Sequence, residues 1–269
     1  MLYAMSDVHG DLHALEGALK NVDLSGNDRL VFLGDYIDYG PQSGEVLRAI
    51  YALQQKHGPE KVVVLRGNHE DAFLEWLDTY GNPPAAEGED LEGMFPWSEW
   101  LEVDPGFETF RSLVRPDQWD FFQWVMYLSD EVRNVEAARM VLEENRELIA
   151  WLRALPYYFE TDRQIFVHAG VDEEAGELWP WVTQKSVFVG KFPPSDGPFY
   201  KDVIAGHAGT DRLSGDPEYH GVYFDGWNHY HIDGSVQRGG RLNILAWDEK
   251  NEAYAQWDNG WRREILSKC

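Results

Sequence analysis

Residues 1–15, MLYAMSDVHGDLHAL, contain a short apolar run that is followed at once by Asp7-Val8-His9-Gly10. If the run is a buried strand, residues two apart share a face, so Asp7 and His9 can bind one ion together. A strand that ends in a polar turn is the simpler explanation of one such pair. The pair therefore indicates a function only if similar side chains join it from elsewhere in the chain.

The order of strand, polar loop and helix recurs twice downstream. Apolar residues at helical spacing predict a helix over about 11–22. The run 29–33 ends in GDYIDYGP and precedes a helical pattern that stops near Gly58, and the run 61–65 ends in RGNHE before another helix. Continuous β-branched runs are typical of strands buried on both faces, so we predict an α/β fold whose sheet is covered by helices.

The character of the sequence changes between about Gly81 and Pro156. A loop rich in proline, glycine and acidic residues opens this segment, and Trp-rich, helix-forming sequence follows. Its clearest pattern predicts one helix from about Val135 to Leu155, which stops at Pro156. We interpret 81–156 as a helical, Trp-rich cap inserted into a single domain of residues 1–269, acting either as a lid or as additional core.

Strands resume in the last part of the chain. The runs 164–167 and 202–205 end in His168 and His207. Beyond them, apolar and polar residues alternate between glycines, which predicts antiparallel strands.

Composition narrows the class of protein. The 269 residues are 43% hydrophobic, enough for a substantial core, and the formal net charge of -24 argues against a nucleic-acid partner. Cys269 is the single cysteine, so an intrachain disulfide and a thiolate metal site are excluded. The sequence shows neither a signal peptide nor an apolar run long enough for a membrane span, so we expect a cytoplasmic protein with no membrane partner.

Polar side chains follow five predicted strands. They are Asp7 and His9, then Asp35 and Asp38, then Asn68 and His69, then His168, and finally His207. In open α/β sheets, sites form outside the carboxyl ends of the strands, so we expect these residues to converge on one crevice. All of them are metal-ligating or proton-transferring types.

The motifs DVHG, GDYIDYG, RGNHE, VHAG and GH, taken in this order, resemble the motif series of the calcineurin-like metallophosphoesterases. Within that superfamily they are most similar to the PPP-type serine/threonine phosphatases and their bacterial relatives. The segment HIDGSVQRGGRLNILAW resembles the strand pair that follows the last histidine in that branch. The resemblance covers most of the chain and implies two mixed β-sheets packed as a sandwich and flanked by helices.

The resemblance implies a binuclear metal centre. Asp7 and His9 would hold a first ion, Asp35 would bridge both ions, and Asn68, His168 and His207 would hold the second. Two divalent ions roughly 3.5 to 4 Å apart need a shared carboxylate, and they activate a bridging water as the hydroxide that attacks phosphorus. Imidazole, carboxylate and amide ligands suit Mn, Fe or Zn, and we expect Mn.

His69 and Asp38 are the candidate catalytic residues. His69 directly follows Asn68, so in an extended segment it would point away from the ligand direction. The resemblance implies that His69 is the general acid and that Asp38 orients it and raises its basicity. The alternative for Asp38 is a turn residue in the sequence DYGP.

The substrate contacts depart from the pattern of the branch. Tyr39 stands where the branch has an arginine, and tyrosine cannot bind phosphate oxygens as a bidentate guanidinium does. The pattern of the branch also has a second arginine, which would fall near 181–183 in this chain. No arginine stands there, and the nearby Lys185 offers only a point charge. Arg66 is either an anion contact or a structural ion-pair partner, so Tyr39 and Arg66 are the candidate substrate-binding residues.

The segment after His207 narrows the choice of branch within the superfamily. GHAGT has no second histidine two residues after His207, which favours PPP-like or symmetrical dinucleoside-tetraphosphatase branches over broad-specificity phosphodiesterases. His231 either lines the site or is structural. His13 and His57 are expected on solvated helix surfaces.

We therefore predict a binuclear metal-dependent phosphoesterase that hydrolyses phosphomonoesters, with Ser/Thr phosphoproteins as the default substrates. Hydrolysis of dinucleoside tetraphosphates is the second hypothesis. The third is a weakly active, metal-binding interaction protein. The sequence leaves the oligomeric state open.

Overall fold

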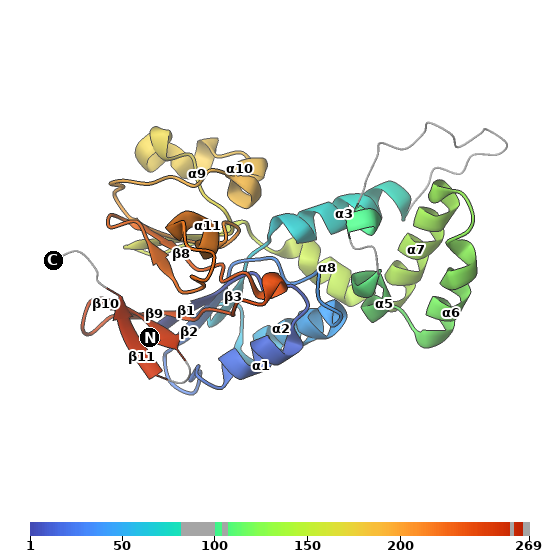
Figure 1. Cartoon of the computed structure of the whole chain (residues 1–269), viewed down its shortest axis with the longest axis horizontal. Coiled ribbons are helices and arrows are strands. Elements are labelled where there is room, and N and C mark those ends of the chain that lie inside the picture. The colour runs from blue at the N-terminus through green and yellow to red at the C-terminus, as the bar shows by residue number, and fades with distance from the viewer. Residues whose placement is uncertain (82–99, 104–106, 259–260, 266–269) are drawn as a thin grey trace.

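The computed structural model describes residues 1–81, 100–103, 107–258 and 261–265. Two β-sheets pack face to face, and helices cover the outer side of each (Figure 1). The elements in chain order are β1 (Leu2–Met5), α1 (Leu12–Leu19), β2 (Arg29–Phe32), α2 (Ser43–His57), β3 (Val62–Val64), α3 (Asn68–Tyr80), α4 (Trp100–Val103), α5 (Glu108–Leu113), α6 (Pro116–Val125), α7 (Asp130–Glu144), α8 (Arg146–Ala154), β4 (Tyr158–Glu160), β5 (Gln164–Val167), η1 (Glu173–Leu178), α9 (Trp179–Val182), α10 (Lys185–Gly190), β6 (Asp202–Ala205), α11 (Thr210–Ser214), β7 (Tyr223–Phe224), β8 (His229–His231), η2 (Val236–Arg238), β9 (Leu245–Asp248), β10 (Ala253–Asp258) and β11 (Trp261–Ile265).

The first sheet has the strand order β11-β10-β9-β1-β2-β3. Strands β1, β2 and β3 are parallel, with Tyr3 opposite Leu30 and Val31 opposite Val63. Helices α1 and α2 make the crossovers between them, as parallel strands require. The predicted β-α units at the start of the chain are confirmed.

The second sheet has the order β4-β5-β6-β8-β7 and is also mixed. The antiparallel prediction holds for β9, β10 and β11 and for the pair β7 and β8. It is wrong for β8 against β6, which are parallel, with Ile204 opposite Tyr230. A crossover that contains α11 and β7 joins these two strands, so alternation along β8 could not reveal its direction.

The side chains of β2 and of Leu33, which directly follows it, show how the layers are stabilised. Leu30 and Phe32 pack into the cluster beneath the helices, whereas Val31 and Leu33 face the second sheet. All four are fully buried. Removing the side chain of such a buried residue typically costs about 2–5 kcal/mol of unfolding free energy.

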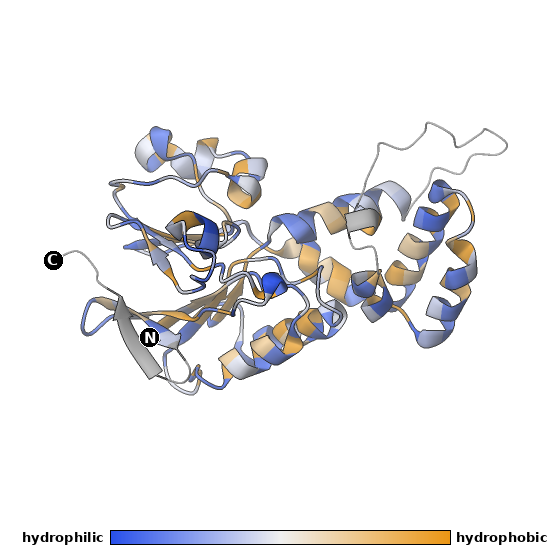
Figure 2. Ribbon diagram, in the orientation of Figure 1, coloured by the Kyte–Doolittle hydropathy of each residue, from blue (hydrophilic) through white to orange (hydrophobic). Residues whose placement is uncertain are grey.

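Strand β6 alternates in the same way on the second sheet. Ile204 faces the first sheet, while Val203 and Ala205 face a third cluster that includes Trp179 of α9. The fold is therefore helix, sheet, sheet, helix, which confirms the predicted sandwich. Figure 2 shows hydrophobic segments along the central strands and along α2 and α8.

The predicted helix from Val135 to Leu155 is two helices, α7 and α8, which meet at Asn145. The buried Asn145 amide donates to the carbonyls of Leu113 and Val141, and its oxygen accepts from Arg48. An asparagine that bonds backbone groups in this way interrupts a helix. The periodicity continues across the break, so the sequence did not show it.

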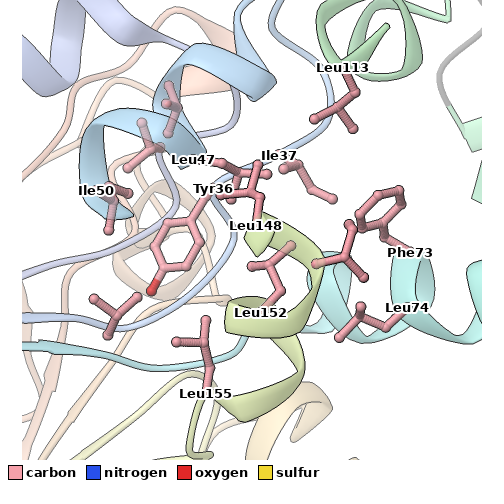
Figure 3. Packing of buried hydrophobic residues seen from close by; sticks show 14 of the residues in the cluster. Tyr36, Ile37, Leu47, Ile50, Phe73, Leu74, Leu113, Leu148, Leu152 and Leu155 are labelled. Atoms are coloured by element: carbon pink, nitrogen blue, oxygen red, sulfur yellow. The ribbon is translucent and has the colours of Figure 1, made fainter. Parts of the chain in front are cut away.

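Helix α8 fills the space between α2 and α3 (Figure 3). The hydrophobic residues that meet there include Leu47 and Ile50 of α2, Phe73 and Leu74 of α3, and Leu148, Leu152 and Leu155 at α8. Tyr36 and Ile37, from the loop after β2, are buried in the same cluster. Helix α8 thus shares a core with the sheet. Whether 81–156 acts as a separate cap stays a prediction, and 82–99 lies outside the described residues.

A buried network of charged groups joins η1 to β8. His229 contacts Asp225 at 2.6 Å through Nδ1 and Glu173 at 3.0 Å through Nε2. Lys191 reaches Glu173 at 3.2 Å. Burial lowers the pKa of His229, but its hydrogen bonds to the two carboxylates outweigh this effect and raise it overall.

This network predicts a pH-dependent stability. Because the folded pKa of His229 lies above the unfolded value of about 6.5, its stabilising contribution is complete below that pH and is lost as the pH rises through the folded pKa. At pH 5.5 we expect His229→Gln to lower the unfolding free energy by about 2 kcal/mol, the value of one hydrogen bond to a charged group. Thermal unfolding of both proteins between pH 5.5 and 9 measures the difference. A difference in unfolding free energy that stays constant or grows as the pH rises contradicts a raised pKa of His229.

Among the described helices, none combines the length and the apolar character needed to cross a membrane.

Candidate active site

The five motif loops converge at the carboxyl ends of β1, β2, β3, β5 and β6, as the sequence predicted. A pocket of about 450 Å³ lies there. The residues that line it are Asp7, His9, Asp35, Tyr39, Asn68, His69, His207, Gly209, Arg212, Asp233, Gln237 and Arg238. His168 lies directly beneath the pocket, where it is fully buried.

Backbone hydrogen bonds hold the first two motif loops side by side. The amides of Asp7 and His9 donate to the carbonyls of Gly34 and Asp35, at 3.0 and 3.1 Å. Six non-glycine residues of the site adopt the left-handed backbone region: Asp7, His9, Asp35, Asp38, Tyr39 and His207. Such strained conformations are typical of functional sites, where the surrounding structure imposes them.

Glycine is required where these loops touch. A Cβ atom on Gly206 would collide with the side chains of Ser6 and Asp7, and one on Gly67 would collide with Asp35. The missing side chains let the backbone approach the carboxylates closely.

The Asp35 carboxylate lies at the centre of the site. Its Oδ2 is 3.3 Å from Nε2 of His168 and 3.9 Å from Nε2 of both His9 and His69. Burial opposes ionisation, but the attraction of the surrounding imidazoles outweighs it and lowers the pKa of Asp35. Two groups of side chains that could each hold a metal ion share this residue: His9, Asp35 and His69, and Asp35, His168 and His207.

The chemistry of Asn68, His168 and His207 fits a cation. Asn68 Oδ1 lies 2.9 Å from His168 Nε2 and 3.0 Å from His207 Nδ1. Because His168 Nδ1 faces the Leu33 carbonyl at 3.1 Å, a neutral ring would carry its proton there and leave the Nε2 lone pair free for a cation. Oxygen and nitrogen lone pairs therefore face one another, an arrangement that a bound cation satisfies. In the metal-free chain, turning the amide over would let its nitrogen donate to both imidazoles.

Asp7 and His9 form the other side of the centre. His9 Nδ1 faces the Ile37 carbonyl at 3.0 Å, which leaves Nε2 directed inward, 3.9 Å from Asp7 Oδ1. The His207 amide donates to Asp7 at 3.1 Å. Burial, followed by the nearby Asp233 carboxylate, raises the pKa of Asp7 well above its usual value. Buried carboxylates so close together fit a site for divalent cations.

The geometry expected for His69 is wrong, although it reaches the site. Asn68 and His69 open helix α3 instead of lying in an extended segment, and the backbone amide of His69 donates to Asp35 Oδ1 at 3.2 Å. His69 Nδ1 lies 2.7 Å from Asp38 Oδ2, and Trp100 Nε1 donates to the same oxygen at 3.1 Å. Asp38 is thus buried against His69, which its alternative as a turn residue does not explain.

Sequence reasoning missed three residues that shape the site. The buried Glu70 carboxylate accepts from the backbone amides of Asp35 and Tyr36 at 2.9 and 2.8 Å, and so fixes the loop after β2. Asp233 lies two residues after β8, so the strand-end rule that found the other motifs could have found it. Trp100 gave no signal, because it is far from Asp38 in sequence.

The two candidate substrate contacts differ. Tyr39 lines the pocket, is 51% exposed, and its ring contacts those of His9 and His69 edge to face. Arg66 is not among the lining residues. Its guanidinium donates to Asp71 and to the carbonyls of Leu152 and Arg153, and this geometry favours the structural alternative.

Two further expectations concern residues outside the pocket. Lys185 lies over the ring of Tyr157, and Trp181 is 78% exposed, so neither segment brings a cation to the pocket. His231 is buried in β8 and is not among the lining residues.

The structure is thus a two-sheet sandwich with two candidate metal-ligand groups at its strand ends. The family profile described as calcineurin-like phosphoesterase matches residues 2–228. The chain therefore belongs to this family, as the motif series indicated.

Known proteins resemble parts or all of the chain. "Putative serine/threonine-protein phosphatase C06A1.3" from Caenorhabditis elegans is 42% identical over 67 residues, 23% of this chain and only 18% of that relative. This match supports the PPP-like branch. The crystal structure of a "putative diadenosine tetraphosphatase" superposes with a TM-score of 0.50 at 17% identity, covering 98% of this chain and 92% of that one. The cold-active protein-tyrosine phosphatase of a psychrophilic Shewanella gives 0.55 at 17% identity, covering 98% and 80%. The two structures show a shared fold.

Proposed function

We propose that the protein hydrolyses phosphomonoesters at a binuclear metal centre in which Asp35 is the shared carboxylate. The observation that carries this proposal is the position of Asp35 Oδ2, within 3.9 Å of imidazole nitrogens that belong to both candidate metal groups. The residues proposed to hold the ions are Asp7 and His9 for one, Asn68, His168 and His207 for the other, and Asp35 for both.

The chain's own residues supply the remaining chemistry. When bound, two divalent cations would provide a nucleophile at neutral pH and stabilise charge on the phosphoryl group. His69 presents Nε2 to the pocket and would donate a proton to the leaving-group oxygen. Asp38 stabilises the imidazolium form through Nδ1, and Trp100 fixes the Asp38 oxygen that makes this bond.

Tyr39 is proposed as a substrate contact on the leaving-group side, because its half-exposed ring touches that of His69. Burial raises the pKa of Tyr39, so its hydroxyl stays protonated and can donate a hydrogen bond. Ser/Thr phosphoproteins are the proposed substrates, in keeping with the short serine/threonine phosphatase match. Manganese and a cytoplasmic location stay predictions from the sequence.

Turnover of matched substrates tests the proposal. With added Mn, the purified protein is expected to hydrolyse p-nitrophenyl phosphate and phosphoserine peptides, and chelation should abolish the activity reversibly. Reconstitution with Mn, Fe or Zn in parallel identifies the preferred ion.

Hydrolysis of diadenosine tetraphosphate, measured beside that of the phosphomonoesters, tests the second hypothesis. One structural neighbour is described as a "putative diadenosine tetraphosphatase". Preferential cleavage of this compound would replace phosphomonoesters as the substrate class. A metal-loaded protein that is inert toward every phosphoester would support the interaction-protein hypothesis. The Asp38–His69 pair argues against that outcome, because binding metal does not require it.

A further inference from the structure

Two arginines line the same pocket as Asp35 and His69, although position 39 lacks one. They are Arg212 of α11 and Arg238 of η2. We propose that Arg212, with Arg238 beside it, binds the phosphate group that is hydrolysed. This inference rests on the proposed phosphomonoesterase function and assigns its anion-binding residues.

The chain anchors both arginines to the site. Helix α11 begins three residues after His207, and η2 begins three residues after Asp233. The amide of Thr210 donates to the Asp233 carbonyl at 2.9 Å, which joins the two loops. A Cβ atom on Gly209 would lie 2.6 Å from the Arg238 guanidinium, so the two segments pack without a gap.

Arg238 is held in place from one side. Its Nη2 donates to both oxygens of Asp211, at 2.8 and 3.0 Å, and to Ser235 Oγ at 2.6 Å. The side chain remains 38% exposed. Asp211 thus compensates the charge of Arg238 and fixes its direction, and Arg238 lines the pocket in this position.

Arg212 has no such partner. Its side chain makes no hydrogen bond or ion pair with any residue that the structure describes, although the chain carries a net charge of -24. Asp211, the nearest carboxylate in sequence, already binds Arg238. A planar guanidinium can donate two parallel hydrogen bonds to phosphate oxygens. The phosphate of a phosphomonoester, a dianion at neutral pH, is the ligand that suits this unpaired cation beside a metal centre.

The substitution Arg212→Gln tests the assignment. It removes an exposed cation without a partner, so folding should be unaffected. We expect the inhibition constant of inorganic phosphate and the KM for p-nitrophenyl phosphate to rise roughly ten- to a hundredfold, as for loss of a charge-assisted hydrogen bond. The kcat should change less, because the contact is made in the ground state as well. Calorimetric titration of the Mn-loaded protein with inorganic phosphate measures the same loss without turnover.

Two further variants sharpen the test. Arg238→Gln removes the second cation that lines the pocket and leaves the neighbouring Asp211 without its ion-pair partner, so it should also weaken phosphate binding. Arg139→Gln is the matched control, because Arg139 pairs with Glu136 and Glu143 on α7, away from the pocket, and should leave phosphate binding unchanged.

The outcomes separate the two proposals. Unchanged phosphate affinity in Arg212→Gln, in an active protein, overturns the inference and leaves the phosphomonoesterase function intact. A raised KM for diadenosine tetraphosphate alone, with phosphate affinity unchanged, also overturns it, because Arg212 would then serve a second phosphate. A wild-type protein that binds phosphate through Arg212 but hydrolyses no phosphomonoester rejects the proposed function instead.

Discussion

Replacing Asp35 by Asn is expected to abolish turnover of p-nitrophenyl phosphate, with kcat falling at least about a thousandfold. The substitution keeps the size and shape of the side chain but removes the charge shared by both proposed metal groups. Two divalent ions bound at the proposed centre would lose the anion that offsets their repulsion, and several kcal/mol of transition-state stabilisation would be lost with it. Metal content after Mn loading, measured by elemental analysis, should fall in parallel.

The control for this experiment is Asp120→Asn on α6, an exposed carboxylate outside the pocket. Its metal content and kcat should match those of the unsubstituted protein. Full activity in Asp35→Asn would remove Asp35 from the centre. Loss of activity with two ions still bound would show that Asp35 acts in chemistry and does not bridge the ions.

His69→Asn is the second large effect, with an expected loss in kcat of roughly a hundred- to ten-thousandfold, the usual contribution of a general acid. The loss should be greater for a phosphoserine peptide than for p-nitrophenyl phosphate, because an alkoxide needs protonation far more than a nitrophenolate. Comparison of kcat for the two substrates in both proteins measures this difference.

The same variant distinguishes two roles for His69. Its Nε2 is 3.9 Å from Asp35 Oδ2 and belongs to one of the candidate metal groups. If His69 is a general acid, His69→Asn keeps its metal content, and the loss in kcat depends on the leaving group. An equal loss for both substrates, together with a missing ion, would identify His69 as a ligand. Asp38→Asn should show the dependence on the leaving group in weaker form, since Asp38 acts through His69.

The order of strands and polar motifs along the chain was enough to predict an α/β fold and the convergence of the strand ends, and the resemblance to the calcineurin-like family implied the sandwich. Strands β1, β2, β3, β5 and β6 are continuous apolar runs, and each ends in a polar motif, so local sequence defines both the strand and its loop. The parallel arrangement then follows from the intervening helices. The strand-end rule placed Asp35 in the crevice, and the resemblance implied that it lies at the centre of the site.

Other features depended on contacts between distant segments. The break at Asn145 depends on Arg48 and on the Leu113 carbonyl, and the contact of Trp100 with Asp38 joins residues 62 positions apart. No periodicity encodes such contacts. The extended segment expected around His69 is a helix start, because a short motif does not show whether its residues continue a strand or begin a helix.

The sequence by itself determined the residue types of the proposed metal centre and their place at the strand ends, because these follow from hydrophobic runs and the polar motifs that end them. Only the tertiary structure decided which cations face the pocket. The Arg66 guanidinium is bound by Asp71 and does not line the pocket, whereas Arg212 and Arg238 do line it. Arg212 lies outside the quoted motifs, and the motif segment that contains Arg238 does not show where its side chain points. The physical reason is that a guanidinium on a long side chain takes its direction from the partners that surround it in space.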